Sequence, residues 1–257
     1  MNRRTVRILA AALAALFLAL IALVNASVKA RMHEVTCNKL QVRILDDWDF
    51  VSEEDVKGYI EKFYGSYIGS RLDSLELHRI ESILDSRSAV LKSEAWYTND
   101  GILHVSITQR EPAARFESGT GSFYIDDRAF IFPVQNGYNK LLPVIDGEIP
   151  IKVEQGFKGE AATPEERAWL RDVLGMVSYM RSRVWGGNIV QIHSDSRGEL
   201  VLVPRAGREK ILFGRPEDIK DKFRRLQQYY EYVVPEKGEG YYSTVNVKYK
   251  GQIVCRK

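Results

Sequence analysis

A long apolar run dominates the beginning of the chain. Residues 8–24 carry no polar side chain, and the apolar character continues with interruptions to Val28. Because an α-helix rises about 1.5 Å per residue, about 20 such residues span a bilayer core of roughly 30 Å. Three arginines precede the run and favour a cytoplasmic N-terminus. The pattern predicts a cytoplasmic tail at 1–7, a transmembrane helix at 8–28 and an extracytoplasmic remainder.

A cleaved signal peptide has the same charged start and apolar middle, and Val24-Asn25-Ala26 is a tolerable cleavage site. The apolar core of a signal peptide usually has about 7–15 residues, which is shorter than this run. A retained anchor is therefore favoured, although Lys29 and Arg31 on the far side weaken the charge asymmetry. Under both interpretations the rest of the chain is exported.

After the apolar run, the hydrophobic period changes several times within residues 34–111. Residues 40–44 alternate between apolar and polar side chains, which predicts a strand. Ser52 precedes three acidic residues, a pattern typical of a helix start, because the hydroxyl accepts an orphan N–H and the acids face the positive dipole end. A second helix is expected at 77–84, and a β-hairpin follows with its turn at 98–101. The predicted order is β-α-α-β-β.

Pro112 lacks an amide proton and is expected to end this unit. The remaining residues, 113–257, are richer in short strand patterns. A hairpin is predicted around Asp126-Asp127-Arg128, and three further strands are predicted near 189–193, 199–203 and 209–213.

Two helices interrupt these strands. The first begins at a capping box formed by Thr163 and Glu166, and the second is expected to open at Pro216 and close at Pro235. Residues 242–254 then alternate in polarity and predict one long terminal strand.

Composition narrows the function classes. The chain has 257 residues, 45% of them hydrophobic, and a net charge of +3, which is too small to indicate a nucleic-acid-binding protein. Two cysteines do not form a disulfide framework, so stability must come from a hydrophobic core. Cys37 and Cys255 fall in separate predicted units, and we expect no bridge between them.

The sequence shows no catalytic chemistry. It contains no nucleophile elbow, zinc-protease motif, P-loop or dinucleotide fingerprint. Four histidines are scattered without the spacing of metal ligands, and the paired aspartates fall in predicted turns. One predicted helix is basic, with Lys220, Lys222, Arg224 and Arg225. We interpret these four residues as a solvated face, and an acidic partner or lipid headgroups are the less common alternative. The sequence therefore indicates no catalytic residue, cofactor or metal site.

Several segments, in order and spacing, resemble one family. Residues 103–116 read LHVSITQREPAARF, an alternating strand followed by a basic residue, a proline and small apolar residues. The hairpin at 123–134, the LPVIDG of 142–147 and the helix and strand within 213–249 follow in the family's order. Together with the single membrane span, they resemble the bacterial cell-division family FtsQ, also called DivIB.

The resemblance implies an α+β protein with a POTRA domain at 34–111 and a β domain with two helices at 113–257. It implies a non-enzymatic divisome scaffold at the division septum, anchored in the inner membrane by one span. Such scaffolds bind the bitopic proteins FtsB and FtsL and help to control septal peptidoglycan synthesis. By analogy the partner adds a strand at the C-terminal edge, and the expected partner-binding residues are Val247, Lys248, Tyr249, Lys250 and Gly251.

Two other function classes stay open at this stage. An exported cell-wall enzyme would need polar residues that converge in space without a linear motif. An assembly factor of the outer membrane also contains POTRA domains, but it carries several copies or a barrel, and the alternating segments of a barrel are missing here.

Overall fold

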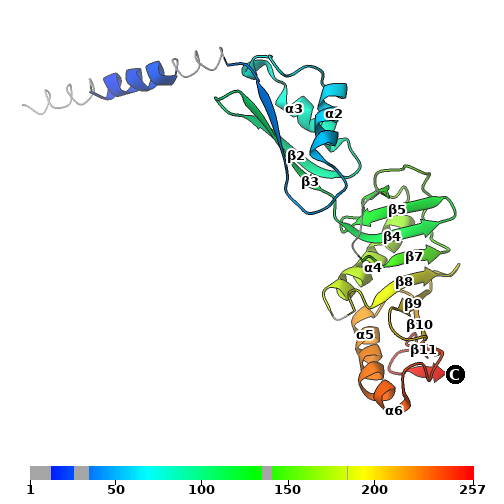
Figure 1. Ribbon diagram of the computed structural model, residues 1–257. Helices are drawn as coiled ribbons and strands as arrows, with labels where there is room; N and C mark the ends of the chain where they lie inside the picture. The colour runs from blue at the N-terminus through cyan, green and yellow to red at the C-terminus, as the bar shows by residue number, and fades with distance from the viewer. Residues whose placement is uncertain (1–12, 26–34, 135–140, 184) are drawn as a thin grey trace, which may run out of the picture. The chain divides into compact units, whose positions relative to one another are not determined.

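The computed structural model describes residues 13–25, 35–134, 141–183 and 185–257 (Figure 1). The chain forms two compact units. The first unit comprises Met1–Asp47 and Val51–Gln109, and the second comprises Trp48–Phe50 and Arg110–Lys257.

The N-terminal apolar region is described only in part. Residues 13–25 form a helix with exposed side chains. Within the described ranges, no helix combines the length and apolar content needed to cross a bilayer. The predicted tail at 1–7 and both ends of the predicted span at 8–28 lie outside the described residues.

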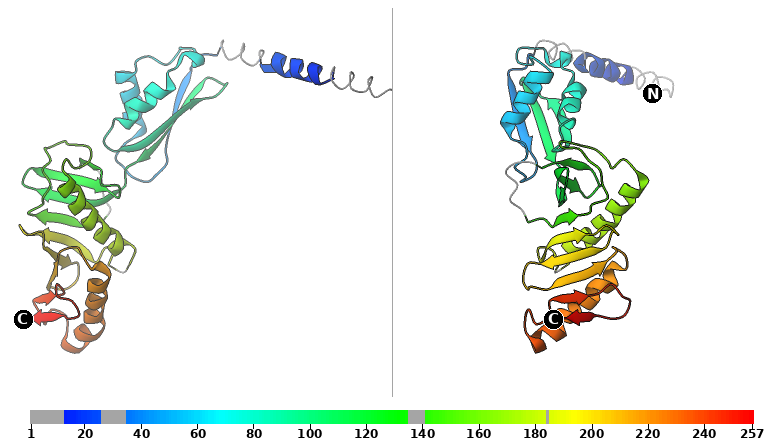
Figure 2. Two further views of the ribbon diagram at one scale, coloured as in Figure 1. Left: turned by 180° about the vertical axis from the view of Figure 1, so that it is seen from behind. Right: turned by 90° about the vertical axis from the view of Figure 1, so that its right-hand side faces the viewer.

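The first unit has the predicted β-α-α-β-β order. Its sheet has the strand order β1-β3-β2, with β1 parallel and β2 antiparallel to β3. Two helices cover one face of this sheet (Figures 1 and 2). The elements are β1 (Lys39–Ile44), α2 (Glu53–Phe63), the 3₁₀ turn η1 (Leu72–Ser74), α3 (Leu77–Asp85), β2 (Val90–Tyr97) and β3 (Ile102–Gln109).

Local signals fix these elements as the sequence predicts. The Ser52 hydroxyl accepts the Asp55 N–H at 3.1 Å, and the Asp55 carboxylate accepts the Ser52 N–H at 2.9 Å, which completes a capping box. Side chains from the helices and β3 are fully buried together, which makes the core of the unit: Val56, Ile60, Ile80, Leu84, Leu103, Val105 and Ile107.

The second unit contains one nine-stranded sheet in the order β12-β11-β10-β9-β8-β7-β4-β5-β6. Its strands are β4 (Pro112–Ser118), β5 (Gly121–Asp126), β6 (Ile131–Pro133), β7 (Val144–Gly147), β8 (Ile189–Ser194), β9 (Leu200–Pro204), β10 (Lys210–Gly214), β11 (Thr244–Asn246) and β12 (Val254–Arg256). The predicted hairpin is confirmed as β5–β6, and the three predicted middle strands are confirmed as β8, β9 and β10. Pro112 begins β4, a position where a missing amide proton is tolerated.

Two long helical segments pack on this sheet and bury its core (Figure 2). The first, α4 (Pro164–Arg181), begins at the predicted capping box, in which Thr163 accepts the Glu166 N–H at 3.2 Å. The second runs through α5 (Ile219–Gln228), the π-helical turn η2 (Tyr229–Val233) and α6 (Val234–Lys237).

The predicted limits of this second helical segment are wrong at both ends. The helix begins at Ile219 because Asp218 adopts a left-handed conformation with φ of 50°, so Pro216 lies outside it. Pro235 does not close the segment. The Val234 N–H donates to the Tyr229 carbonyl, five residues back, and this wider π turn accommodates the proline in the last helical turn.

Cys37 and Cys255 are both free thiols, and they belong to different units. Burial raises the pKa of each thiol.

Candidate functional site

The C-terminal end of the nine-stranded sheet is a free edge. Strand β12 pairs with β11 through the register Val245↔Cys255, and no strand of the described chain pairs with its other side. In Figure 1 this edge carries the C-terminus. An unpaired strand presents N–H and C=O groups that a further strand can bind.

The single strand predicted at 242–254 is wrong. The structure has two short strands, β11 and β12, separated by residues 247–253, and we call residues 247–252 the C-terminal turn. Gly251 lies in this turn with φ of 72°, a backbone conformation that residues with a side chain rarely adopt, and the chain reverses there. Alternation continues through the turn in the sequence, but the backbone does not remain extended.

Arg225 on α5 holds the C-terminal turn in place. Its guanidinium donates to the carbonyls of Val247 at 3.0 Å, Tyr249 at 2.5 Å and Gln252 at 2.5 Å. Its Nε donates to the Asp221 carboxylate at 3.1 Å. The Arg225 side chain is only 5% exposed. These hydrogen bonds therefore provide acceptors for a buried cation and, at the same time, a donor for each of the three carbonyls.

The interpretation of residues 220–225 as a solvated basic face is therefore wrong for two of its members. Arg225 and Lys222 are each only 4% exposed. The Lys222 ammonium donates to the Arg215 carbonyl at 2.7 Å, and burial lowers its pKa. Lys220 and Arg224 are exposed as expected. Helical periodicity could have identified Lys222, because it lies three residues after Ile219 and four before Leu226 on the apolar face, whereas the burial of Arg225 depends on its contact with the distant C-terminal turn.

Both polar groups of Lys248, the ammonium and the backbone N–H, bind other groups of the same chain. Its ammonium forms an ion pair with Glu199, and its N–H donates to the Asn246 side chain at 2.9 Å. Its aliphatic stem crosses Gly214 so closely that an added Cβ there would lie 2.9 Å from the Lys248 Cγ. A side chain at position 214 would displace this lysine.

The five expected partner-binding residues therefore differ in exposure. Val247 is fully buried and Lys248 is half-buried, whereas Tyr249, Lys250 and Gly251 are exposed on the C-terminal turn. The structure brings them together beside β12. Sequence reasoning missed Arg225, Glu199 and the edge strand Val254–Arg256, because their relation depends on contacts distant in the sequence.

The tyrosines near this edge divide between packing and surface. Burial raises the pKa of Tyr229 to about 12, and the Tyr230 hydroxyl donates to Glu209 at 2.6 Å. Tyr232 is 70% exposed. Among the residues that the structure describes, no group of three or more His, Cys, Asp or Glu side chains could hold a metal ion.

Two known protein families match this chain, one over most of the first unit and the other over most of the second. A family described as POTRA-like domain matches residues 35–108, and one described as FtsQ/DivIB, C-terminal related, matches residues 111–256. These domains are those of a cell-division scaffold, a class that is generally non-enzymatic. The chain belongs to the FtsQ/DivIB family. No curated protein matches it.

Proposed function

We propose that this protein is a membrane-anchored divisome scaffold that binds FtsB/FtsL-like bitopic proteins and helps to control septal peptidoglycan synthesis. The apolar run at 8–28 anchors it in the inner membrane with the N-terminus in the cytoplasm. The POTRA domain at 34–111 and the β domain at 113–257 then lie outside that membrane, at the division septum. Membership of the FtsQ/DivIB family supports this assignment.

The partner adds a strand to β12. In strand addition, main-chain hydrogen bonds supply affinity and side chains beside the edge supply specificity. On the C-terminal turn, Tyr249 offers apolar area and a hydroxyl, and Lys250 offers a positive charge to an acidic partner. The observation that carries this proposal is the free outer side of β12 within the described sheet.

Arg225 makes this edge suitable for binding. It fixes three carbonyls of the C-terminal turn before any partner arrives. A loop that is already ordered loses less conformational entropy on association, so more of the interaction energy appears as affinity.

The experiment is a calorimetric titration of the full chain in detergent micelles with the extracytoplasmic segments of an FtsB–FtsL pair. Tyr249→Ala should weaken binding by about 1–3 kcal/mol, as expected for an aromatic interface residue. Tyr232→Ala removes a tyrosine of similar exposure from η2 and should leave the affinity unchanged. Equal affinity of both variants and the parent protein would place the partner site elsewhere.

A further inference from the structure

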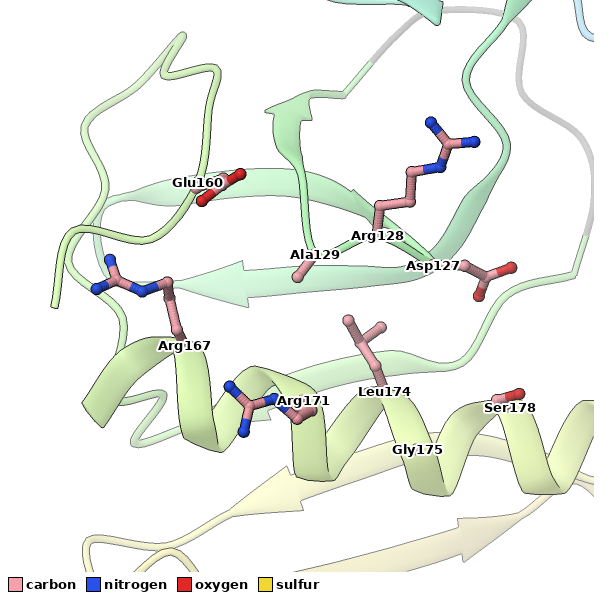
Figure 3. A pocket seen from close by; sticks show the side chains of 9 residues that line it. All are labelled: Asp127, Arg128, Ala129, Glu160, Arg167, Arg171, Leu174, Gly175 and Ser178. Carbon is pink, nitrogen blue, oxygen red and sulfur yellow. The ribbon is translucent and has the colours of Figure 1, made fainter. Parts of the chain in front are cut away.

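A second surface, at the opposite end of the sheet order, has features of a binding groove. It lies between α4 and the turn that joins β5 to β6, and has a volume of about 560 Å³ (Figure 3). Its charged lining residues are three arginines and two acids: Arg128, Arg167, Arg171, Asp127 and Glu160. Because β12 ends the other side of the sheet, this groove is independent of the proposed partner edge.

The positive charge of the three arginines in this groove is only partly balanced, because Glu160 is the one acid of the lining that forms no ion pair elsewhere in the described residues. Asp127 pairs with Arg181 at 3.3 Å, outside the lining. Arg167 donates to two main-chain carbonyls, which carry no net charge. The guanidinium groups of Arg128 and Arg171 make no hydrogen bond or ion pair within the described parts of the chain. Arg167 and Arg171 are also one helical turn apart, where like charges repel each other.

Gly175 leaves the helix side of the groove uncovered. Glycine in the middle of a helix is unfavourable relative to alanine. A Cβ added at Gly175 would meet no atom within 4 Å, so no contact inside the described protein requires glycine there. Leu174, the neighbouring residue, points from the helix toward this space (Figure 3) but is only 7% exposed, so the surface at this point is mainly the Gly175 backbone. The bare backbone lets a ligand approach α4 closely.

Ala129 faces the helix from the other wall (Figure 3). Its φ is 64°, a left-handed conformation that is rare for residues with a Cβ and is usually taken by glycine or asparagine in such turns. Strained positions of this kind concentrate at binding sites. The groove therefore places a small apolar surface, formed by Ala129 and the Gly175 backbone, beside the guanidinium groups of Arg128 and Arg171.

We propose that this groove binds a short acidic peptide segment of a partner protein. Carboxylates of the peptide pair with Arg128 and Arg171, since guanidinium groups form bidentate hydrogen bonds with carboxylates. An apolar side chain of the peptide packs on Ala129 and on the exposed backbone at Gly175. The volume suits a few residues, since ligand pockets are typically about 300–1,000 Å³. A polyphosphate would make no use of the apolar surface at Ala129 and Gly175, whereas Glu160 would repel either anionic ligand and does not distinguish them.

The test uses the full chain in detergent micelles and a fluorescent Glu-Leu-Glu-Glu peptide, with Gln-Leu-Gln-Gln as the uncharged probe. Anisotropy should detect binding of the acidic peptide alone. Arg128→Gln combined with Arg171→Gln should weaken it by roughly tenfold or more, because two charge-assisted contacts are lost. The control combines Arg197→Gln with Lys220→Gln, which removes the same charge from exposed positions outside the groove lining.

Gly175→Leu separates seating in the groove from general attraction of charge. The variant keeps every charge and fills the open space, so it should also abolish binding while circular dichroism stays unchanged. Unchanged binding in Gly175→Leu, or an equal loss in the control pair, would overturn the proposal. Preference for a polyphosphate of equal charge over the peptide would overturn the choice of a peptide as ligand.

Discussion

The two edges of the nine-stranded sheet differ in how they are covered. At one end, Gly159 bridges the outer side of β6, with the Ile131 N–H donating to the Gly159 carbonyl at 2.8 Å and the Gly159 N–H donating back at 2.9 Å. We call this the closed edge. At the other end, no strand of the described chain pairs with the outer side of β12, which we call the open edge. Since an uncovered strand presents unpaired N–H and C=O groups, the open edge is the one of the two that can accept a further strand.

Each edge is also held by a helix. Near the closed edge, Glu166 of α4 accepts the Lys152 N–H, and Arg167 donates to the carbonyls of Ala161 and Ala162, which lie in the same connecting segment as Gly159. Near the open edge, Arg225 of α5 binds the carbonyls of the C-terminal turn. The first set of contacts fixes a segment that covers an edge, and the second fixes a turn beside an edge that stays exposed.

The largest effect is expected from removing the cation at the open edge. Arg225→Met leaves three carbonyls of the C-terminal turn without a donor and should lower the unfolding free energy of the β domain by about 3–5 kcal/mol. Urea unfolding measures the loss of free energy, and a separate hydrogen-exchange measurement on residues 247–256 shows whether the C-terminal turn and β12 open more often. Arg224→Met removes an exposed neighbour that also contacts Asp221, and it should change little. Equal stability of the two variants would contradict the role of Arg225.

A proline at the bridge should convert the closed edge into an open one. Gly159→Pro removes the N–H that Ile131 accepts and cannot adopt the φ of 139° found there, so we expect a loss of about 2–3 kcal/mol. The exposed β6 should then promote self-association, measured by sedimentation velocity.

Gly159→Ala provides the matched control, since it keeps the N–H and adds a Cβ only 3.5 Å from the Phe157 ring, an ordinary contact. It introduces backbone strain without removing the donor. Self-association of the alanine variant to the same extent would show that the bridge does not protect the edge.

Acid should loosen the connecting segment that contains Gly159 and covers the closed edge. Burial opposes the charge of Glu166, but hydrogen bonds from the N–H groups of Thr163, Lys152 and Ala162 outweigh it and hold the pKa of this carboxyl below its ordinary value. Its contribution to stability is therefore complete above the unfolded pKa of about 4.3 and is lost as the pH falls through the lower folded value. Glu166→Gln should cost about 1 kcal/mol at neutral pH and remove this pH dependence. An unaltered acid transition in the variant would contradict the assignment.

The smallest effect concerns the ion pair beside the open edge. Lys248→Glu places two carboxylates together and should destabilise the domain by about 1 kcal/mol or less, since both side chains are partly exposed. Adding Glu199→Lys should restore the stability, as thermal unfolding would measure. If the double variant does not regain the parent's stability, the packing of the Lys248 aliphatic stem over Gly214, and not the lysine charge, stabilises the domain.

The two units were not equally predictable from the sequence. Each strand and helix of the β-α-α-β-β order in the first unit has a local signal, such as the Ser52 cap or the turn at 98–101, and these elements were confirmed, whereas the short turn η1 was not predicted. At the open edge, Val245 and Val247 alternate with polar residues as in a continuous strand. The interruption comes from Gly251 and from Arg225, which lies 24 residues from Tyr249 in the sequence. Periodicity does not reveal a contact made at that separation.

We propose that the partner strand binds at the open edge and not at the closed edge. Amide hydrogen exchange of the full chain in detergent, with and without saturating FtsB–FtsL extracytoplasmic segments, tests it directly. We expect slower exchange in Val254–Arg256 on binding, because a new strand takes up free N–H groups of β12, and no change in Ile131–Pro133. Unchanged exchange in β12 at full occupancy, with new protection elsewhere, would contradict it.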